Sequence, residues 1–129
     1  MAGETLALMD AGAVRGAVAA VSGPSACPDC GHLRCAGWES VGAPVQEPLL
    51  ECIGSLRDMA QDEPTLAEYH PHGTHYWQAE APIALAYFPY NRCSVWRCRH
   101  CHRGFLQYTE YGGYYTDHRI REVDPTRLA

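Results

Sequence analysis

The sequence predicts a small α+β domain, in which two helices pack against an antiparallel sheet and a four-cysteine metal site joins the front of the chain to the back. Three observations predict this class. Apolar residues recur at helical spacing in the first half, and all eight tyrosines lie in residues 69–115. Two C-x-x-C elements, "CPDC" at 27–30 and "CRHC" at 98–101, stand far apart. A chain of 129 residues has the length of one domain, so we expect residues 1–129 to fold as a unit.

The first helix is expected over residues 4–21, within an N-terminal segment 1–26. Its apolar residues are spaced by three and four positions, which places them on one helical face. They are Leu6, Met9, Ala13, Ala17 and Val21. Gly23 and Pro24 cannot continue a helix, so the helix is expected to end before them.

The second helix is expected over residues 48–61, inside a helical insertion at 44–63. Pro48 suits a first helical turn, and Pro64 ends the segment. The apolar stripe consists of Leu49, Ile53, Leu56 and Ala60. Cys52 lies on this stripe and is expected in the core, so its replacement by Ala should leave metal binding intact.

The second half, residues 75–123, is expected to form the sheet. Segments 75–79, 83–90 and 92–97 have the composition of short strands. Residues 104–123 predict a hairpin around Gly112 and Gly113, a pair that tolerates positive φ in a two-residue turn. That turn would place Tyr111 opposite Tyr114, and Phe105 opposite Ile120 on the face toward the core.

The two cysteine pairs predict one structural zinc site, bound by Cys27, Cys30, Cys98 and Cys101. In a C-x-x-C turn both sulfurs can point at one ion. In the first turn, within residues 27–35, Pro28 fixes φ and Gly31 permits a left-handed conformation. Four thiolates leave no open position for water, so the predicted role of the ion is structural.

This arrangement resembles a zinc ribbon, in which two cysteine-bearing turns on β-hairpins hold one zinc ion. The resemblance covers both turns and the final hairpin. The long insertion between the turns departs from a compact ribbon. The chain as a whole is also similar to small bacterial proteins, a likeness that implies no function.

The ligand set and the metal have alternatives. Cys35 follows the first pair and Cys93 precedes the second, each with four residues between, so either can replace one of the four ligands, as can the nearby histidines. An iron–sulfur cluster would also take four thiolates. A redox pair at "CPDC" is disfavoured, because Gly31 and Gly37 argue against the long helix that such a pair requires. Seven cysteines fit a closed disulfide framework poorly, which favours a reducing, cytoplasmic location.

Three further groups are candidate sites. His70, His72 and His75 form a weak candidate for a second, catalytic metal site. Four arginines surround the second cysteine pair, where they can bind phosphates or pair within the chain: Arg92, Arg97, Arg99 and Arg103. Tyrosines of the final hairpin are candidate nucleic-acid or partner contacts, namely Tyr108, Tyr111 and Tyr114, and Tyr115 belongs to the same group.

A net charge of −5 argues against nucleic acid or an anionic membrane as the main partner. Residues 5–21 are too short and too charged to span a bilayer. The first hypothesis is therefore a non-catalytic cytoplasmic zinc protein that binds another protein, as an adaptor or an immunity-like inhibitor. The second is a nucleic-acid-binding ribbon, and the third is a metal-dependent enzyme that uses the histidine cluster. The sequence does not indicate the oligomeric state.

Overall fold

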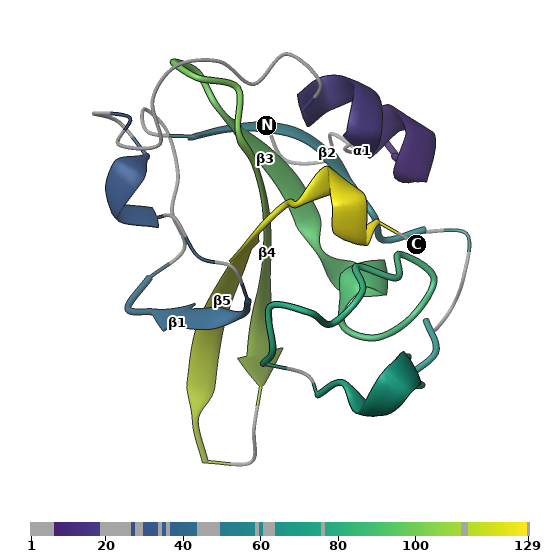
Figure 1. The fold of residues 1–129 in the computed structure, drawn as a ribbon. Coiled ribbons are helices and arrows are strands. Elements are labelled where there is room, and N and C mark those ends of the chain that lie inside the picture. The colour runs from purple at the N-terminus through teal and green to yellow at the C-terminus, as the bar shows by residue number, and fades with distance from the viewer. Residues whose placement is uncertain are drawn as a thin grey trace.

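The computed structural model describes residues 7–18, 27, 30–33, 35, 37–43, 50–58, 60, 64–75, 77–111 and 114–128. Within these ranges the chain forms one α-helix, α1 (Ala11–Val18), and a five-stranded antiparallel sheet. The strands are β1 (Glu39–Val41), β2 (Leu50–Ser55), β3 (Ser94–Cys98), β4 (Gly104–Tyr111) and β5 (Thr116–Glu122). Their order across the sheet is β1-β5-β4-β3-β2, as Figure 1 shows. The fold is therefore mostly β.

The prediction of two helices against a sheet is wrong. Residues 50–55 form strand β2, which pairs with β3 and places Leu50 opposite Cys98. A bulge between Cys52 and Gly54 shifts the register. Gly54 also lies against Met9, where any side chain would collide with the methionine sulfur. Pairing with a strand more than forty residues away thus outweighs the local helical spacing.

The first helix is shorter than predicted. It begins at Ala11, because Asp10 caps it by accepting a hydrogen bond from the backbone of Ala13 at 2.8 Å. Residues 7–9 are extended and pair with the end of β2 through two backbone hydrogen bonds to Ser55. Helix α1 packs against β3 and β4. Residues 1–6 and 19–26 lie outside the described residues.

Of the three short strands predicted over 75–97, the structure contains the last one, as β3. The described residues of segment 64–93 form turns, an isolated bridge from Ile83 to Leu128, and two 3-10 helices, Pro71–Gly73 and Tyr90–Arg92. Two more 3-10 helices span Gly31–Leu33 and Pro125–Arg127. A buried arginine of β5, Arg121, holds this segment to the sheet through the carbonyls of Ala79 and Ala81 and the hydroxyl of Tyr90. Side-chain contacts of this kind leave no strand pattern in the sequence.

The predicted β4–β5 hairpin is confirmed, but its register is wrong by two residues. Tyr111 lies opposite Thr116, and Phe105 lies opposite Glu122. The connection therefore spans residues 112–115, of which Gly112 and Gly113 lie outside the described residues. Because the shift is even, every residue keeps its predicted face of the sheet.

The sheet carries a core cluster on each face. Phe105 and Ile120 are buried with the cysteines on the predicted core face. The opposite face holds a second, larger cluster. It includes Val14, Val18, Trp38, Val95, Leu106 and Tyr108. None of the helices that the structure describes is long and apolar enough to cross a membrane.

Candidate metal centre

The second cysteine turn connects two paired strands. Cys98 ends β3, and Gly104 begins β4 opposite Arg97. The turn is closed by backbone hydrogen bonds from Cys98 to the carbonyl of Arg103 at 2.8 Å and from His102 to the carbonyl of Cys98 at 3.0 Å. His102 takes the left-handed conformation, with φ of 67°. Two strands therefore fix both ends of this turn.

The first cysteine turn uses the same closure. The backbone N–H of Gly31 donates to the carbonyl of Cys27 at 2.8 Å, as His102 does to Cys98. The chain then enters the 3-10 helix Gly31–Leu33, where Leu33 donates to the carbonyl of Cys30 at 2.8 Å. Gly31 thus begins a short helix, and the left-handed position that it was expected to provide is taken by His102 in the other turn.

The four cysteine sulfurs converge on one point. The sulfurs of Cys27 and Cys98 lie 3.9 Å apart, and those of Cys30 and Cys101 lie 3.4 Å apart. All four fall within 4.8 Å of one another. A disulfide bond needs about 2.05 Å. A regular tetrahedron around an ion at about 2.3 Å from each sulfur has edges of about 3.8 Å. The group can therefore hold one metal ion.

The site is enclosed by apolar side chains. The four cysteines expose at most 3% of their surface. They pack with Leu33, Leu50, Phe105 and Ile120, which come from the first turn, β2, β4 and β5. Residues more than sixty positions apart thus form one dry shell around the sulfurs.

Burial disfavours thiolates at this site without a cation. It raises the pKa of Cys30, which the sulfurs of Cys101, Cys98 and Cys27 raise further. Burial also raises the pKa of Cys98. Burial acts in the same direction on Cys101, but hydrogen bonds from the backbone and guanidinium of Arg103 and from Cys30 outweigh it and lower its pKa to about 7. A bound cation would allow all four groups to ionise.

The remaining cysteines lie outside this group. Cys35 is buried in the same cluster, but its sulfur faces the carbonyl of Ile120 at 3.8 Å. Cys93 is buried in the core of the opposite face, with its sulfur 3.3 Å from the carbonyl of Pro89. Cys52 is half-buried on β2, which corrects its predicted place on a helix.

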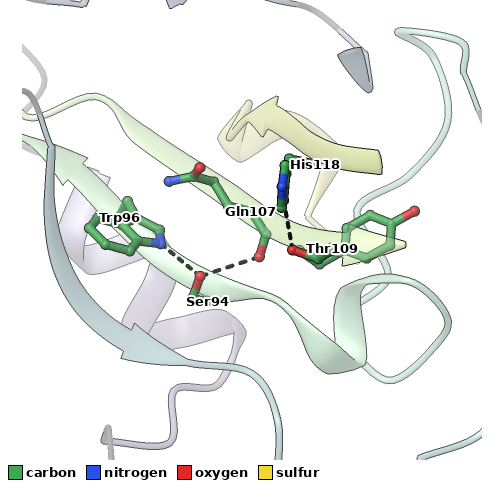
Figure 2. Close-up of a pocket in the computed structure, with 6 residues that line it drawn as sticks. Ser94, Trp96, Gln107, Thr109 and His118 are labelled. Carbon is green, nitrogen blue, oxygen red and sulfur yellow. Dashed lines mark hydrogen bonds between the residues drawn. The ribbon is translucent and has the colours of Figure 1, made fainter. Parts of the chain in front are cut away.

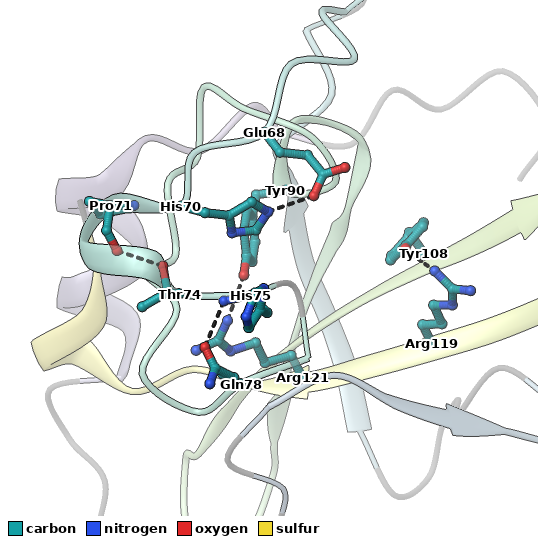
Figure 3. A network of polar contacts seen from close by, with 10 residues as sticks. All are labelled: Glu68, His70, Pro71, Thr74, His75, Gln78, Tyr90, Tyr108, Arg119 and Arg121. Atoms are coloured by element: carbon teal, nitrogen blue, oxygen red, sulfur yellow. Dashed lines mark hydrogen bonds and ion pairs between the residues drawn. The ribbon is translucent and has the colours of Figure 1, made fainter.

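The predicted histidine cluster does not form among the described side chains. His70 turns toward Glu68, with its Nε2 2.6 Å from the carboxylate, while His75 lies apart from this pair (Figure 3). The side chain of His72 lies outside the described residues. Among the described residues, the group of metal-ligating side chains whose ligand atoms all lie within 4.8 Å of one another is that of the four cysteines.

The arginines near the second cysteine turn have partners within the chain. Arg97 lies 3.6 Å from Glu51, and Arg103 lies 3.7 Å from Glu122. Arg92 lies over the ring of Phe88 and donates to the carbonyl of Thr65. Arg99 also interacts with another part of the chain. The candidate phosphate-binding group is therefore engaged in intramolecular contacts.

The candidate tyrosines divide into two groups. Tyr108 is buried, packs edge-on against Trp38 with ring centroids 5.0 Å apart, and accepts a hydrogen bond from Arg119. Its side chain therefore packs largely in the core. Tyr111, Tyr114 and Tyr115 lie at the tip of the β4–β5 hairpin and expose 79%, 104% and 57% of their surface.

The structure also shows a small hollow that the sequence did not indicate. It opens on the face of the sheet that carries the cysteines, beside β3, β4 and β5 (Figure 2). Its lining is Ser94, Trp96, Gln107, Tyr108, Thr109 and His118. Except for Tyr108, which belongs to the opposite face, these residues alternate along their strands, but the cross-strand register that brings them together is not visible in the sequence.

Comparison of the chain with protein-family models, curated proteins and solved structures finds no match. The expected likeness to small bacterial proteins therefore has no support from these comparisons. They give no support to the expected resemblance to a zinc ribbon either, and the four-cysteine group that could hold a metal ion is what the structure itself shows.

Proposed function

We propose that this chain is a non-catalytic, zinc-stabilised protein that acts by binding another protein. One observation carries the non-catalytic part. The structure supplies four buried cysteine sulfurs at tetrahedral spacing. An ion held by all four has no open position for water or substrate, which catalytic zinc requires.

Zinc fits this site better than a cluster of iron and sulfide. Four thiolates in a tetrahedron suit zinc or iron. Sulfurs within 4.8 Å of one another leave room for one ion and no room for a cluster of several atoms between them. A single iron would share the geometry, and its absorption in the visible range distinguishes it from colourless zinc.

The likeness to a zinc ribbon extends to one of the two turns. The turn of Cys98 and Cys101 connects two antiparallel strands, as in a ribbon. The turn of Cys27 and Cys30 leads into a 3-10 helix, and β1 lies farther along the chain. We infer that the site joins a ribbon-like hairpin to an unrelated segment. Cysteines that are not joined in disulfides suit a reducing compartment such as the cytoplasm.

The hairpin tip supports a protein partner. Figure 1 shows the β4–β5 hairpin extending past the neighbouring strands. Tyr111, Tyr114 and Tyr115 are exposed there, and tyrosine is enriched at protein interfaces. Glu110 and Asp117 face each other just below the tip. These acids would repel phosphates, which favours a protein over nucleic acid or an anionic membrane.

The metal proposal is tested by elemental analysis of protein purified under reducing conditions. We expect one zinc per chain, retained in Cys52→Ala and Cys93→Ser and lost in Cys30→Ser and Cys98→Ser. Two ions per chain would support the enzyme hypothesis. Absence of zinc from the wild-type protein, or loss of zinc in Cys52→Ala, would contradict the proposed site.

The partner proposal is tested by affinity capture from the native cell with the zinc-loaded protein. We expect a protein that is captured by the wild type and by Leu66→Ser, which alters an exposed residue elsewhere. The double variant Tyr111→Ser with Tyr114→Ser should lose it. Equal capture of the protein by Leu66→Ser and by the double tyrosine variant would contradict a role for the tip in partner binding.

The nucleic-acid alternative is tested by titration with single- and double-stranded oligonucleotides at two salt concentrations. We expect no affinity beyond the non-specific level of roughly 10⁻⁴ to 10⁻⁶ M at physiological salt. Submicromolar binding that is abolished by Arg97→Ala with Arg99→Ala would favour the alternative.

A further inference from the structure

The hollow lies on the cysteine-bearing face of the sheet, nearer the hairpin tip than the cysteines. Pairing places Ser94 opposite Gln107 and Thr109 opposite His118, so all four share this face. The hollow measures about 80 Å³. A cavity of about 150 Å³ holds a benzene molecule, so the hollow has room for a smaller group, such as the end of one side chain.

Hydrogen bonds fix the walls of the hollow, as Figure 2 shows. The indole N–H of Trp96 donates to the hydroxyl of Ser94 at 2.7 Å, and this hydroxyl donates to the carbonyl of Gln107 at 3.3 Å. The hydroxyl of Thr109 lies 3.0 Å from Nδ1 of His118, which leaves Nε2 as the ring nitrogen that can bind a ligand. The hollow thus combines a flat indole, an imidazole and a largely buried carboxamide, that of Gln107.

No aspartate, glutamate, lysine or arginine lines the hollow. Strand alternation places Arg97, Arg119 and Arg121 on the opposite face, because each is adjacent in sequence to a residue of the hollow's face. A carboxylate or an ammonium group would lose its hydration here without meeting an arginine, a lysine or a carboxylate side chain. A phosphate chain would find no arginine of β3, β4 or β5 on this face.

We propose that the hollow receives the carboxamide end of one asparagine or glutamine side chain from a partner polypeptide. A carboxamide is planar, uncharged and smaller than a benzene ring. It donates and accepts hydrogen bonds, as the imidazole in the wall does. Its flat face matches the indole of Trp96. Small-molecule sites usually measure about 300 to 1,000 Å³, so the size of the hollow favours a side chain over a free ligand.

The identity of the occupant as part of a protein rests on the proposed function. The hollow is continuous with the tip through Tyr111 and Thr116, which form the next pair on the same face. One partner can therefore contact the tyrosines while a side chain enters the hollow. The hollow would act as the specific pocket of a larger interface.

The hollow is tested by NMR titration of the zinc-loaded protein with three probes of one size: propionamide, propionate and propylammonium. The chain has three tryptophans, and the other two are internal controls: Trp38 is buried in the opposite core and Trp77 is exposed outside the hollow. We expect propionamide to shift the indole signal of Trp96 saturably, with a Kd of about 1 to 50 mM for so small a probe. The charged probes should bind at least about tenfold more weakly, a difference of about 1.4 kcal/mol.

Variants separate binding in the hollow from general effects on the fold. Thr109→Val and His118→Phe should weaken propionamide binding at least about fivefold while keeping the zinc content and melting temperature of the wild type. Tyr114→Ser, the matched control on the tip, should bind propionamide normally. No saturable shift of Trp96 up to about 200 mM propionamide, or equal binding of the charged probes, would overturn the proposal.

Failure of this inference is distinguishable from failure of the proposed function. The probe experiment needs no partner, and the capture experiment relies on the tip variants. If an oligonucleotide shifts Trp96 at submicromolar concentration and displaces propionamide, the occupant is a nucleobase and the proposal is overturned. If Thr109→Val reduces capture of a partner that Leu66→Ser retains, the proposal is supported.

Discussion

A single buried arginine, Arg121, fastens the 64–93 segment to the sheet. Its side chain is fully buried and donates to the hydroxyl of Tyr90 at 2.6 Å and to the carbonyls of Ala79 and Ala81 at 3.1 and 2.8 Å (Figure 3 shows the pair with Tyr90). Its Nε has no partner among the described atoms. The guanidinium therefore satisfies three oxygens from a segment that lacks regular strands.

We expect Arg121→Met to lower the free energy of unfolding by about 2 to 4 kcal/mol, because three buried acceptors lose their donor. Tyr90→Phe removes one acceptor and should cost about 1 to 2 kcal/mol. Arg127→Met is the control. Because Arg127 is exposed, this substitution should lower the free energy of unfolding by less than about 0.5 kcal/mol. Urea unfolding measures all three. A value for Arg121→Met within error of the control would show that the arginine does not hold the segment.

His102 occupies the left-handed conformation in the second cysteine turn, a region where side chains other than glycine are strained. We expect His102→Ala to be about 1 kcal/mol less stable than His102→Gly at saturating zinc. The same pair of substitutions at the exposed neighbour His100 should show no such advantage for glycine. Thermal unfolding gives the comparison, and an equal effect at both positions would contradict the assigned role of the turn.

At the level of elements, helix α1 meets the sheet where β4 begins. A Cβ at Gly104 would lie 2.5 Å from a methyl group of Val18, which is closer than real side chains approach. The helix thus lies against bare backbone at this point. The packing of one helix depends on the absence of a side chain in the strand beneath it.

We expect Gly104→Ala to destabilise the protein by about 1 to 3 kcal/mol through overpacking. In the double variant with Val18→Ala, most of this cost should disappear, giving a coupling energy of at least about 1 kcal/mol. A double-mutant cycle in urea measures it. Additive costs would show that the helix does not sit on Gly104.

The sequence was informative where structure is local and misleading where it depends on distant partners. Each C-x-x-C turn is set by a few neighbouring residues, so the spacing identified the candidate ligands. Strand β2 was not predicted, because its extended conformation depends on pairing with β3, which places Leu50 opposite Cys98. In the sequence, Leu49, Ile53 and Leu56 have the spacing of a helical face. The hollow was missed for the same reason, since it exists only in the observed register.

At the level of the whole molecule, the metal site closes a long loop. Cys27 and Cys98 are 71 positions apart, and β1 and β2 lie between them. If the entropy of a disulfide loop applies, closing this loop contributes on the order of 4 kcal/mol. That is a large part of the stability expected for a domain of this size.

We expect removal of the metal by a chelator to lower the melting temperature by more than about 10 °C. Cys98→Ser with Cys101→Ser should melt like the chelated protein and should not respond to the chelator. Cys93→Ser should still respond to the chelator, because its sulfur lies in the opposite core. An unchanged melting temperature of the chelated wild type would contradict a structural metal.

The strand order has a consequence for how fast the chain folds. Strand β1 pairs with β5, so Glu39 must find Ile120, 81 positions along the chain. Such distant pairings slow folding. Once the four cysteines hold an ion, the route from Glu39 to Cys30 spans nine positions and that from Cys101 to Ile120 spans nineteen. Zinc added before refolding should therefore accelerate formation of the β1–β5 pairing. The ion would help to nucleate the sheet as well as stabilise the native state.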